Sequence, residues 1–396
     1  MKKQITGFLA GIIAAALIMC VAFPSVAATI EAAFNSVNIM VNGARQADIG
    51  ESLRLADGRE VPYSINYNGT VYLPLRKLAE LIGMEVAWDA GTSTAALYDG
   101  RERALLDIPT YDGNPSTGHP SVVHVPGGGW NGYKYWMADT PYPAESRENP
   151  SVFASNDGVN WVVPNGAPNP VVPLSEIQAD GYGHSSDTNL VMLPDNTLAL
   201  YYRVVGGVEV IYRKTSSDGK TWDNKHRCFK VLGSGSDVLS PAVVIVGGTY
   251  YMYAVNASTG PYKITRRTSK DGLNWSEPVD CTQPLNRAWH IDVCYAGGKY
   301  RMLAATHAEW NIYYLESEDG LNWTQPYDGP AIKRSGEEYD INGYYKAAMI
   351  PRPGQKLLFD VWVTSMSSFE SVNVYDNSCV WRTLYLKNVD LEKGPN

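Results

Sequence analysis

Four copies of one short turn constrain the fold of this chain more than any other feature. They occupy residues 155–161, 217–222, 269–275 and 317–323, and in each an Asp-Gly pair is followed closely by Trp. Asp-Gly favours a tight hairpin, because Gly tolerates a positive φ and the Asp side chain accepts hydrogen bonds from nearby amides. The turns recur about every 50 to 60 residues, a period typical of the blades of a β-propeller.

Two apolar segments precede each turn, and each pair predicts two antiparallel strands. The first segments are 119–125, 186–193, 240–246, 290–296 and 345–350, and the second are 133–138, 197–203, 249–256, 299–306 and 356–363. These segments make five units, and in the fifth the turn has decayed to residues 376–381, as expected where a ring closes. We therefore predict a mainly β fold, with a five-bladed β-propeller over residues 105–396.

The four turns resemble the Asp-box repeats of sialidase-like propellers. That resemblance implies a structural role, away from the active mouth, for Asp157, Asp218, Asp271 and Asp319. Repeated turn chemistry also explains these aspartates fully. The functional site is therefore expected elsewhere.

A small α+β domain is predicted over residues 36–99. Strands are expected at 37–43, 60–65, 71–73, 85–89 and 93–97. Residues 75–82 place their apolar side chains on one helical face, with Pro74 in the first turn and Gly83 as a stop. The order VNG, YLPLRKLAELIGMEVAWD and TAAL resembles the copper amine oxidase-like N-terminal domain of exported Gram-positive proteins. The resemblance implies a stalk or attachment module, and no histidine that could bind copper precedes His119.

The first residues predict export. Lys2 and Lys3 precede an apolar run at 8–23, and small residues follow it at 25–28. This order is typical of a secretory signal peptide, here residues 1–28, and the run is too short to favour a permanent membrane anchor. We expect a secreted or cell-surface protein of Gram-positive type, with no membrane insertion after signal cleavage. A formal net charge of −8 without basic runs argues against nucleic acid as a partner.

Polar and aromatic residues gather at the predicted strand ends of the propeller. The first strand of each blade lines the axis, so the residues at its start converge on one mouth. The carboxylates that are candidates for acid and base roles are Asp187, Asp139, Glu148 and Asp292. The side chains expected to bind a sugar by hydrogen bonds or stacking are His119, Trp130, His184, Arg203, Trp289, His290, His307 and Tyr344. The expected partner is therefore a poly- or oligosaccharide.

The predicted ring and segments such as GHPSVVHVP, YKYWMADTPYP and ENPSVFASNDGVNW resemble the five-bladed propellers of glycoside hydrolase families 43 and 32. The resemblance covers about residues 112–390. It implies an Asp base in the first blade, an Asp that tunes the pKa of the acid in the second, and a Glu acid in the third. Asp187 matches the second position. His119 lies at the first position and Ser240 at the third, so two of the three expected residues are missing.

These residues predict hydrolysis of glycosidic bonds in an extracellular polysaccharide. The alternative is a non-catalytic glycan-binding or surface-adhesion protein, while a protein-binding adaptor fits less well because the polar residues gather at the mouth. Two carboxyl groups across the mouth, roughly 5 to 9.5 Å apart, favour hydrolysis. A single carboxylate among histidines and aromatics favours binding.

No cofactor or metal ion is expected, and the protein is expected to be a monomer. A metal site is kept as an alternative. His119, His184 and His290 could meet near the axis with Asp292, and calcium or another cation in the central channel would fit the resemblance to the hydrolase propellers. Histidines that form hydrogen bonds in a polar cup are commoner than metal ligands.

Overall fold

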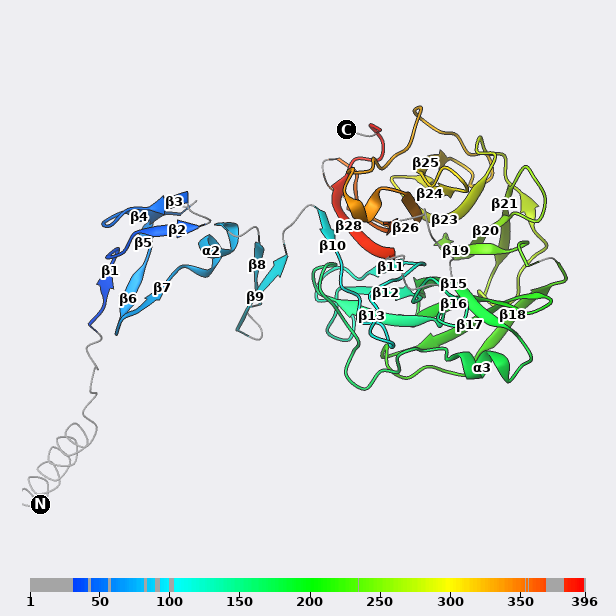
Figure 1. Ribbon diagram of the computed structural model, residues 1–396, viewed down its shortest axis with the longest axis horizontal. Coiled ribbons are helices and arrows are strands. Elements are labelled where there is room, and N and C mark those ends of the chain that lie inside the picture. Colours follow the sequence, from blue (N-terminus) through cyan, green and yellow to red (C-terminus); the bar gives the residue numbers. More distant parts are fainter. Residues whose placement is uncertain are drawn as a thin grey trace, which may run out of the picture. The chain divides into compact units, whose positions relative to one another are not determined.

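The structure, a computed structural model, describes residues 31–394 except 42–43, 56–57, 82–83, 90–92, 100–102, 234, 353, 355 and 368–380. The chain divides into two compact units, Met1–Leu97 and Tyr98–Asn396, which are described separately (Figure 1). The predicted signal peptide, residues 1–28, lies outside the described residues. Within the described ranges, no helix is long and apolar enough to cross a bilayer.

In its described residues, the N-terminal unit consists of short antiparallel strands and one helix. Three small sheets are formed by β1, β6 and β7, by β2 and β3, and by β4 and β5, and α2 precedes the pair β8 and β9. Pro74 and the apolar residues that follow it explain the helix position. The bounds are β1 Ala33–Phe34, β2 Ile39–Val41, β3 Ala44–Ala47, β4 Ser52–Arg54, β5 Glu60–Pro62, β6 Ile65–Tyr67, β7 Thr70–Tyr72, α2 Leu75–Leu81, β8 Met84–Asp89 and β9 Thr94–Asp99.

The C-terminal unit contains five antiparallel sheets, which correspond to the five predicted units and which we call blades 1 to 5 (Figure 1). Blade 1 has β11 Ser121–His124, β12 Tyr135–Asp139, β13 Ser151–Ser155 and β14 Trp161–Val162; blade 2 has β15 His184–Met192, β16 Leu198–Val205, β17 Glu209–Ser216 and β18 His226–Val231. Blade 3 has β19 Leu239–Val246, β20 Thr249–Asn256, β21 Lys263–Ser269 and β22 Val279–Asp280; blade 4 has β23 Ala288–Ala296, β24 Lys299–Thr306 and β25 Ile312–Ser317. Blade 5 has β26 Gly343–Arg352, β27 Leu358–Met366, β28 Trp381–Val389 and β10 Arg103–Leu105, and the two short helices are α3 Leu174–Gln178 and η1 Glu338–Asp340.

The first strands of the blades form a closed ring. β11 contacts β15, which contacts β19, which contacts β23, which contacts β26, and β26 contacts β11 again. An apolar cluster fills each of the five interfaces between neighbouring blades. The predicted mainly β fold is confirmed, and the burial of both faces of each blade explains the continuous apolar segments in the sequence.

The ring is closed by strands from the two ends of the propeller unit. β10 pairs antiparallel with β28, with Arg103 opposite Leu386 and Leu105 opposite Leu384. The predicted decayed turn at 376–381 lies mostly outside the described residues, and its last residue, Trp381, begins β28.

The four Asp-Gly turns share one hydrogen-bond pattern. In the first, Oδ1 of Asp157 accepts from the backbone N–H of Val159 at 2.9 Å and of Asn160 at 2.8 Å. The turns at Asp218, Asp271 and Asp319 repeat the pattern. All four carboxylates are therefore engaged by their own turns, as their sequence predicts.

Each of these turns also packs against a neighbouring blade. The carbonyl of Gly272 accepts a hydrogen bond from the Tyr201 hydroxyl at 2.8 Å, and Gly158 accepts one from the indole N–H of Trp362 at 2.8 Å. A Cβ on Gly219 would overlap the fully buried ring of Trp136. The turn glycines thus provide a positive φ and also the space for an aromatic ring from the neighbouring blade.

Irregularities interrupt the first strands near the mouth of the ring. The register shifts between Ser186 and Asn189 in β15, and similar shifts occur in β19, β23 and β26. Asp187 has φ 46° and Ser240 has φ 51°, in the left-handed region that non-glycine residues seldom adopt. Such bulges redirect side chains, here at the strand ends that surround the axis.

Candidate functional site

A pocket of about 340 Å³ lies at the mouth of the ring. The loop after β12, the starts of β15, β19, β23 and β26, and the end of β16 contribute its walls. The lining residues are His119, Tyr142, Ala144, Glu145, Glu148, His184, Ser186, Asp187, Arg203, Val205, Gly235, Ser236, Leu239, Trp289, His290 and Tyr345. All five blades therefore contribute to the pocket or its immediate rim.

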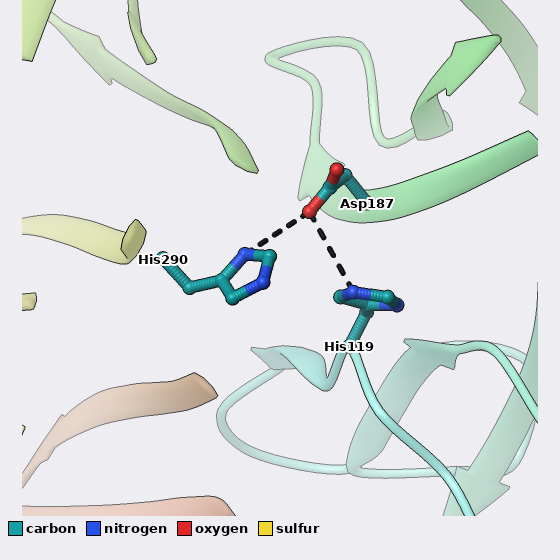
Figure 2. Close-up of side chains that lie close together, drawn as sticks. All are labelled: His119, Asp187 and His290. Carbon is teal, nitrogen blue, oxygen red and sulfur yellow. Dashed lines mark ion pairs between the residues drawn. The ribbon is translucent and has the colours of Figure 1, made fainter. Parts of the chain in front are cut away.

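Three buried side chains from three blades meet at the base of this pocket. Figure 2 shows Asp187 of β15 pointing between His290 of β23 and His119, which precedes β11. Oδ1 of Asp187 lies 3.1 Å from Nδ1 of His290 and 3.7 Å from Nε2 of His119. Each side chain is no more than 2% exposed. We call these residues the His-Asp-His cluster.

The orientation of His119 is fixed by its surroundings. Its Nδ1 lies 2.7 Å from Oγ1 of Thr140, and its backbone N–H donates to Oδ1 of Asp139 at 2.7 Å. With a proton on Nδ1 donated to Thr140, Nε2 presents a lone pair toward Asp187. This arrangement suits a histidine that binds a ligand through Nε2.

Asp187 is held by a charged network on its other side. Nη1 of Arg203 lies 3.4 Å from Oδ2 of Asp187 and donates to Oγ of Ser186 at 3.0 Å. Nε of Arg203 donates to Oε1 of Glu209 at 2.7 Å. Arg203 thus neutralises two buried carboxylates and leaves Oδ1 of Asp187 facing the histidines.

The electrostatics favour neutral histidines beside an ionised carboxylate. Burial lowers the pKa of His119 well below its ordinary value and lowers that of His290 as well. Burial alone would raise the pKa of Asp187, but His290, His119 and Arg203 more than offset it and hold that pKa well below its ordinary value. Two neutral imidazoles and one carboxylate are therefore present at neutral pH.

A second carboxyl group, Glu148, lines the pocket. Its Oε2 lies 3.9 Å from Nδ1 of His119, and the residue is buried. Burial, and then the charge of Asp187, raise the pKa of Glu148 well above its ordinary value. A carboxyl group with a raised pKa is suited to exchange protons near neutral pH.

The structure brings together seven of the twelve site residues predicted from the sequence. His119, Glu148, His184, Asp187, Arg203, Trp289 and His290 line the pocket, whereas Asp139, Asp292, Trp130, His307 and Tyr344 do not. Trp130 instead packs against Trp136, and the Tyr344 hydroxyl donates to Asp340 at 2.7 Å. His307 stacks on Trp289, with ring centroids 4.7 Å apart. His184 lies 3.6 Å from Glu145, apart from the His-Asp-His cluster.

Asp139 and Asp292 are buried behind the pocket. Asp139 accepts hydrogen bonds from the backbone N–H groups of His119 and Thr140, and Asp292 accepts one from Met349 at 2.8 Å. Burial raises the pKa of both carboxyl groups to about 6. Their positions explain a structural role, so we do not assign them to acid or base catalysis.

The axis of the ring also holds a buried ammonium group. Lys346 is 2% exposed, and its Nζ donates to the carbonyl of Thr188 at 3.0 Å. Its charge acts on Asp187, Asp292 and Asp139, and burial lowers its pKa. The ammonium group of Lys346 therefore provides positive charge for the three buried carboxylates near the axis. Calcium in the central channel stays an untested alternative.

Sequence reasoning missed Tyr345, which lines the pocket where Tyr344 was expected. The shift between Tyr344 and Ala347 in β26 changes which side chain faces the mouth. Strict alternation along a strand has a period of two, so a bulge of one residue exchanges the two faces. Glu145 also lines the pocket from an irregular loop, where no strand pattern could place it.

The His-Asp-His cluster has the chemistry and spacing of a metal site. One ligand atom from each residue lies within 4.8 Å of the other two. Ligands about 2.1 Å from a tetrahedral cation lie roughly 3.4 Å apart, close to the two distances from Oδ1 of Asp187. Within the described part of the chain, Nε2 of His290 has no hydrogen-bond partner, and Nδ1 of His290 and Oδ1 of Asp187 have none besides each other. The residues therefore fit a divalent cation with positions left for other ligands.

Comparisons with known proteins agree with both units. Residues 55–112 match the copper amine oxidase N-terminal domain, which confirms the resemblance seen in the sequence. The chain is also 28% identical over 283 residues to an A type blood N-acetyl-α-D-galactosamine deacetylase of Flavonifractor plautii. That alignment covers 56% of this chain and 36% of the relative, so the chain spans about a third of the length of the curated relative.

Solved structures share the fold. An N-acetylgalactosamine deacetylase from F. plautii, in complex with blood group B trisaccharide, has a TM-score of 0.64 at 22% identity, covering 71% of this chain and 93% of that chain. A thermostable family-43 glycoside hydrolase has a TM-score of 0.52 at 17% identity, covering 68% and 88%. An α-L-arabinofuranosidase from Podospora anserina has a TM-score of 0.52 at 14% identity, covering 72% and 94%. The resemblance to family 43 propellers is therefore confirmed for the fold.

Proposed function

We propose that this protein removes the acetyl group from an N-acetylated sugar at the end of a glycan, with His119, Asp187 and His290 holding a divalent cation. The observation that carries the proposal is the His-Asp-His cluster at the base of the pocket, whose members pair with one another while Nε2 of His290 has no hydrogen-bond partner among the described residues. The names of the curated relative and of one solved neighbour, both deacetylases of N-acetylgalactosamine, support the choice of reaction.

The proposed reaction is hydrolysis of an amide. A cation in the cluster would supply Lewis-acid polarisation of the acetamide carbonyl and of the attacking water. Glu148 accepts a proton from water as its oxygen attacks the carbonyl carbon, and then gives that proton to the sugar nitrogen as the C–N bond breaks. The products are acetate and an amino sugar. Arg203 keeps Asp187 ionised and in place throughout.

Glycosidic hydrolysis, which the sequence predicts, fits the pocket less well. It requires one carboxylic acid and one carboxylate free to act on either side of the bond. Glu148 can supply one, but Asp187 is surrounded by two histidines and Arg203. The two residues that depart from the glycosidase pattern have other roles. His119 belongs to the His-Asp-His cluster, and the hydroxyl of Ser240 forms hydrogen bonds with the backbone of Ile291.

The test separates the three candidate functions by their products. Purified protein is incubated with a panel of oligosaccharides that carry terminal N-acetylhexosamine, and acetate and new reducing ends are measured separately. Release of acetate alone supports deacetylation, and release of reducing sugar supports glycosidic hydrolysis. Binding to the panel with neither product supports the non-catalytic alternative and contradicts the proposal.

Metal removal should abolish acetate release. Protein treated with a chelator and dialysed is expected to retain less than about 1% of its activity, because the cation supplies the polarisation. Adding back zinc, manganese, cobalt or nickel ions should restore it, and the most effective ion should bind at one per chain. That ion should also raise the melting temperature of the metal-free protein. Full activity in protein shown to be metal-free by elemental analysis contradicts the proposal.

Replacing Glu148 with glutamine should lower kcat by roughly a hundredfold to ten-thousandfold, the usual contribution of a general acid-base group. Metal content should stay unchanged, because Glu148 is outside the cluster. Glu148 must be ionised to accept a proton, so the wild-type rate should rise as the pH increases through the raised pKa of this group. The acidic limb of the pH–rate profile should disappear in Glu148→Gln. An unchanged profile would assign this limb to another group.

We also propose that the protein acts outside the cell on a poly- or oligosaccharide, with the N-terminal unit as a stalk. The signal-like residues 1–28 and the match to the copper amine oxidase N-terminal domain support this location. The location is checked by fractionating a culture of the native host into medium, cell surface and cytoplasm. The processed chain should be recovered in the medium or on the cell surface, beginning after about residue 28.

A further inference from the structure

We infer that the rim of blade 4 forms a second sugar subsite, which binds the residue next to the sugar held in the pocket. The inference rests on the proposed function and names its substrate class: an oligosaccharide or glycan end instead of a free monosaccharide. The side chains that form this rim are Trp289, His307 and Trp310, which we call the blade 4 platform.

The platform is continuous with the pocket. Trp289 lines the pocket and lies near the start of β23, next to His290. His307 stacks on it, with ring planes inclined by 25°, and Trp310 meets His307 edge to face with centroids 5.2 Å apart. All three residues are half-buried, so each side chain exposes part of its ring to solvent and packs the rest against the protein.

The loop that presents Trp310 is strained and braced. Ala308 has φ 80° and Trp310 has φ 54°, both in the left-handed region that non-glycine residues seldom adopt. Nη2 of Arg334 donates to the carbonyl of Glu309 at 2.6 Å, and the carbonyl of Trp310 accepts from the backbone N–H of Tyr344 at 2.8 Å. Strain maintained in this way is typical of loops that hold a side chain ready for a ligand.

The two sides of the pocket differ in chemistry, which sets the direction of the glycan. Charged and polar groups on blades 1 and 2 surround the cluster, among them Glu145, Glu148 and Arg203. The opposite side is aromatic, where Tyr345 lies beside Trp289 and Trp310. The C–H face of a pyranose stacks on aromatic rings, while polar groups fix the reacting sugar. The remainder of a glycan is therefore expected to leave over the platform.

The pocket is small compared with a long glycan. Its volume of about 340 Å³ is near the lower limit for small-molecule sites. The remainder of a longer glycan is therefore expected to extend beyond the pocket. Because Trp289 belongs to both surfaces, the platform is the surface that the next ring meets first on the aromatic side.

The test compares a monosaccharide with a longer ligand. Binding is measured by calorimetry with methyl N-acetyl-α-D-galactosaminide and with the A type blood trisaccharide, using wild-type protein, Trp310→Ala, Trp310→Phe and Tyr295→Ala. Tyr295 is the matched control, an exposed aromatic on the same strand as Trp289 but near its other end. Metal-loaded protein is used, with Glu148→Gln added to each of the four proteins so that turnover does not affect the result.

Wild-type protein should bind the trisaccharide about tenfold more tightly than the monosaccharide. Trp310→Ala should lose roughly three- to tenfold in affinity for the trisaccharide alone, in line with one stacking contact. Trp310→Phe should keep most of the preference, and Tyr295→Ala all of it. Melting temperatures identify any variant that does not fold, and the phenylalanine variant then carries the test.

Equal affinity of wild-type protein for the two ligands, or no binding of either, overturns the subsite. So does a trisaccharide preference that Trp310→Ala leaves intact. These outcomes are independent of acetate release, which tests the proposed function. A protein that binds the trisaccharide through Trp310 but releases no acetate would retain the subsite and lose the deacetylase assignment.

Discussion

Replacing Asp187 with asparagine should reduce acetate release at least about a thousandfold. Loss of an outer partner of a metal ligand typically costs about ten- to a hundredfold, and Asp187 is proposed as a ligand itself. The amide that replaces it is a weak ligand without charge, so Arg203 would also lose an ion-pair partner. Metal content after dialysis should fall in parallel with the rate, and both are measured on the same sample.

Asp292→Asn is the matched control for this substitution. It makes the same chemical change at a buried aspartate near the axis that does not line the pocket. An asparagine oxygen can still accept the hydrogen bond from Met349, and burial already raises the pKa of Asp292 to about 6, so a neutral side chain costs little. Activity within about threefold of wild type is expected. If Asp187→Asn keeps its metal and its rate, the metal assignment of the cluster is wrong.

Replacing Gly219 with alanine should destabilise the propeller by roughly 2 to 5 kcal/mol. Gly219 has φ 72°, and the new Cβ would overlap the ring of Trp136, which is fully buried between blades 1 and 2. The left-handed backbone costs about 1 to 2 kcal/mol, and overpacking of a core adds about 1 to 3 kcal/mol. A melting temperature lower by roughly 5 to 10 °C is expected in a calorimetric scan.

Gly248→Ala separates these two costs. Gly248 lies in the hairpin between β19 and β20 with φ 74°, and nothing lies within 4 Å of the position of a Cβ. The backbone cost is therefore present without the overlap, and a loss of only about 1 to 2 kcal/mol is expected. Equal losses in the two variants would show that the contact with Trp136 adds nothing.

Most of the architecture could be predicted because local chemistry repeats along the chain. Asp-Gly and Trp recur at nearly the same offset, and two of the apolar segments before them form β20 and β24 with the bounds expected from the sequence. The convergence of Asp187 and the two histidines could also be predicted, since these residues lie at the starts of first strands. Ring closure places such positions together whatever their separation in sequence.

The errors arise where long-range packing replaces local pattern. Tyr345 lines the pocket in place of Tyr344 because β26 contains a bulge. The alternation of side chains along a strand, which is all that the sequence pattern gives, does not reveal a bulge. The burial of Asp139 behind His119 depends on hydrogen bonds between segments, and the role of His119 emerges only when three blades meet. Sequence alone shows that the first Asp of the glycosidase pattern is missing, but what the histidine there does instead depends on its neighbours in space.

The pairing of β10 with β28 has a mechanical consequence. The chain enters the ring through this strand of three residues, so a pull transmitted along the preceding segment would load it first. Arg103 acts as an anchor there, because its guanidinium lies 2.8 Å from the buried carboxylate of Asp340 and donates to the hydroxyls of Tyr339 and Tyr344. Tension applied to the chain ahead of β10 would thus be borne at a reinforced pair of strands, on the opposite side of blade 5 from the strand that faces the axis.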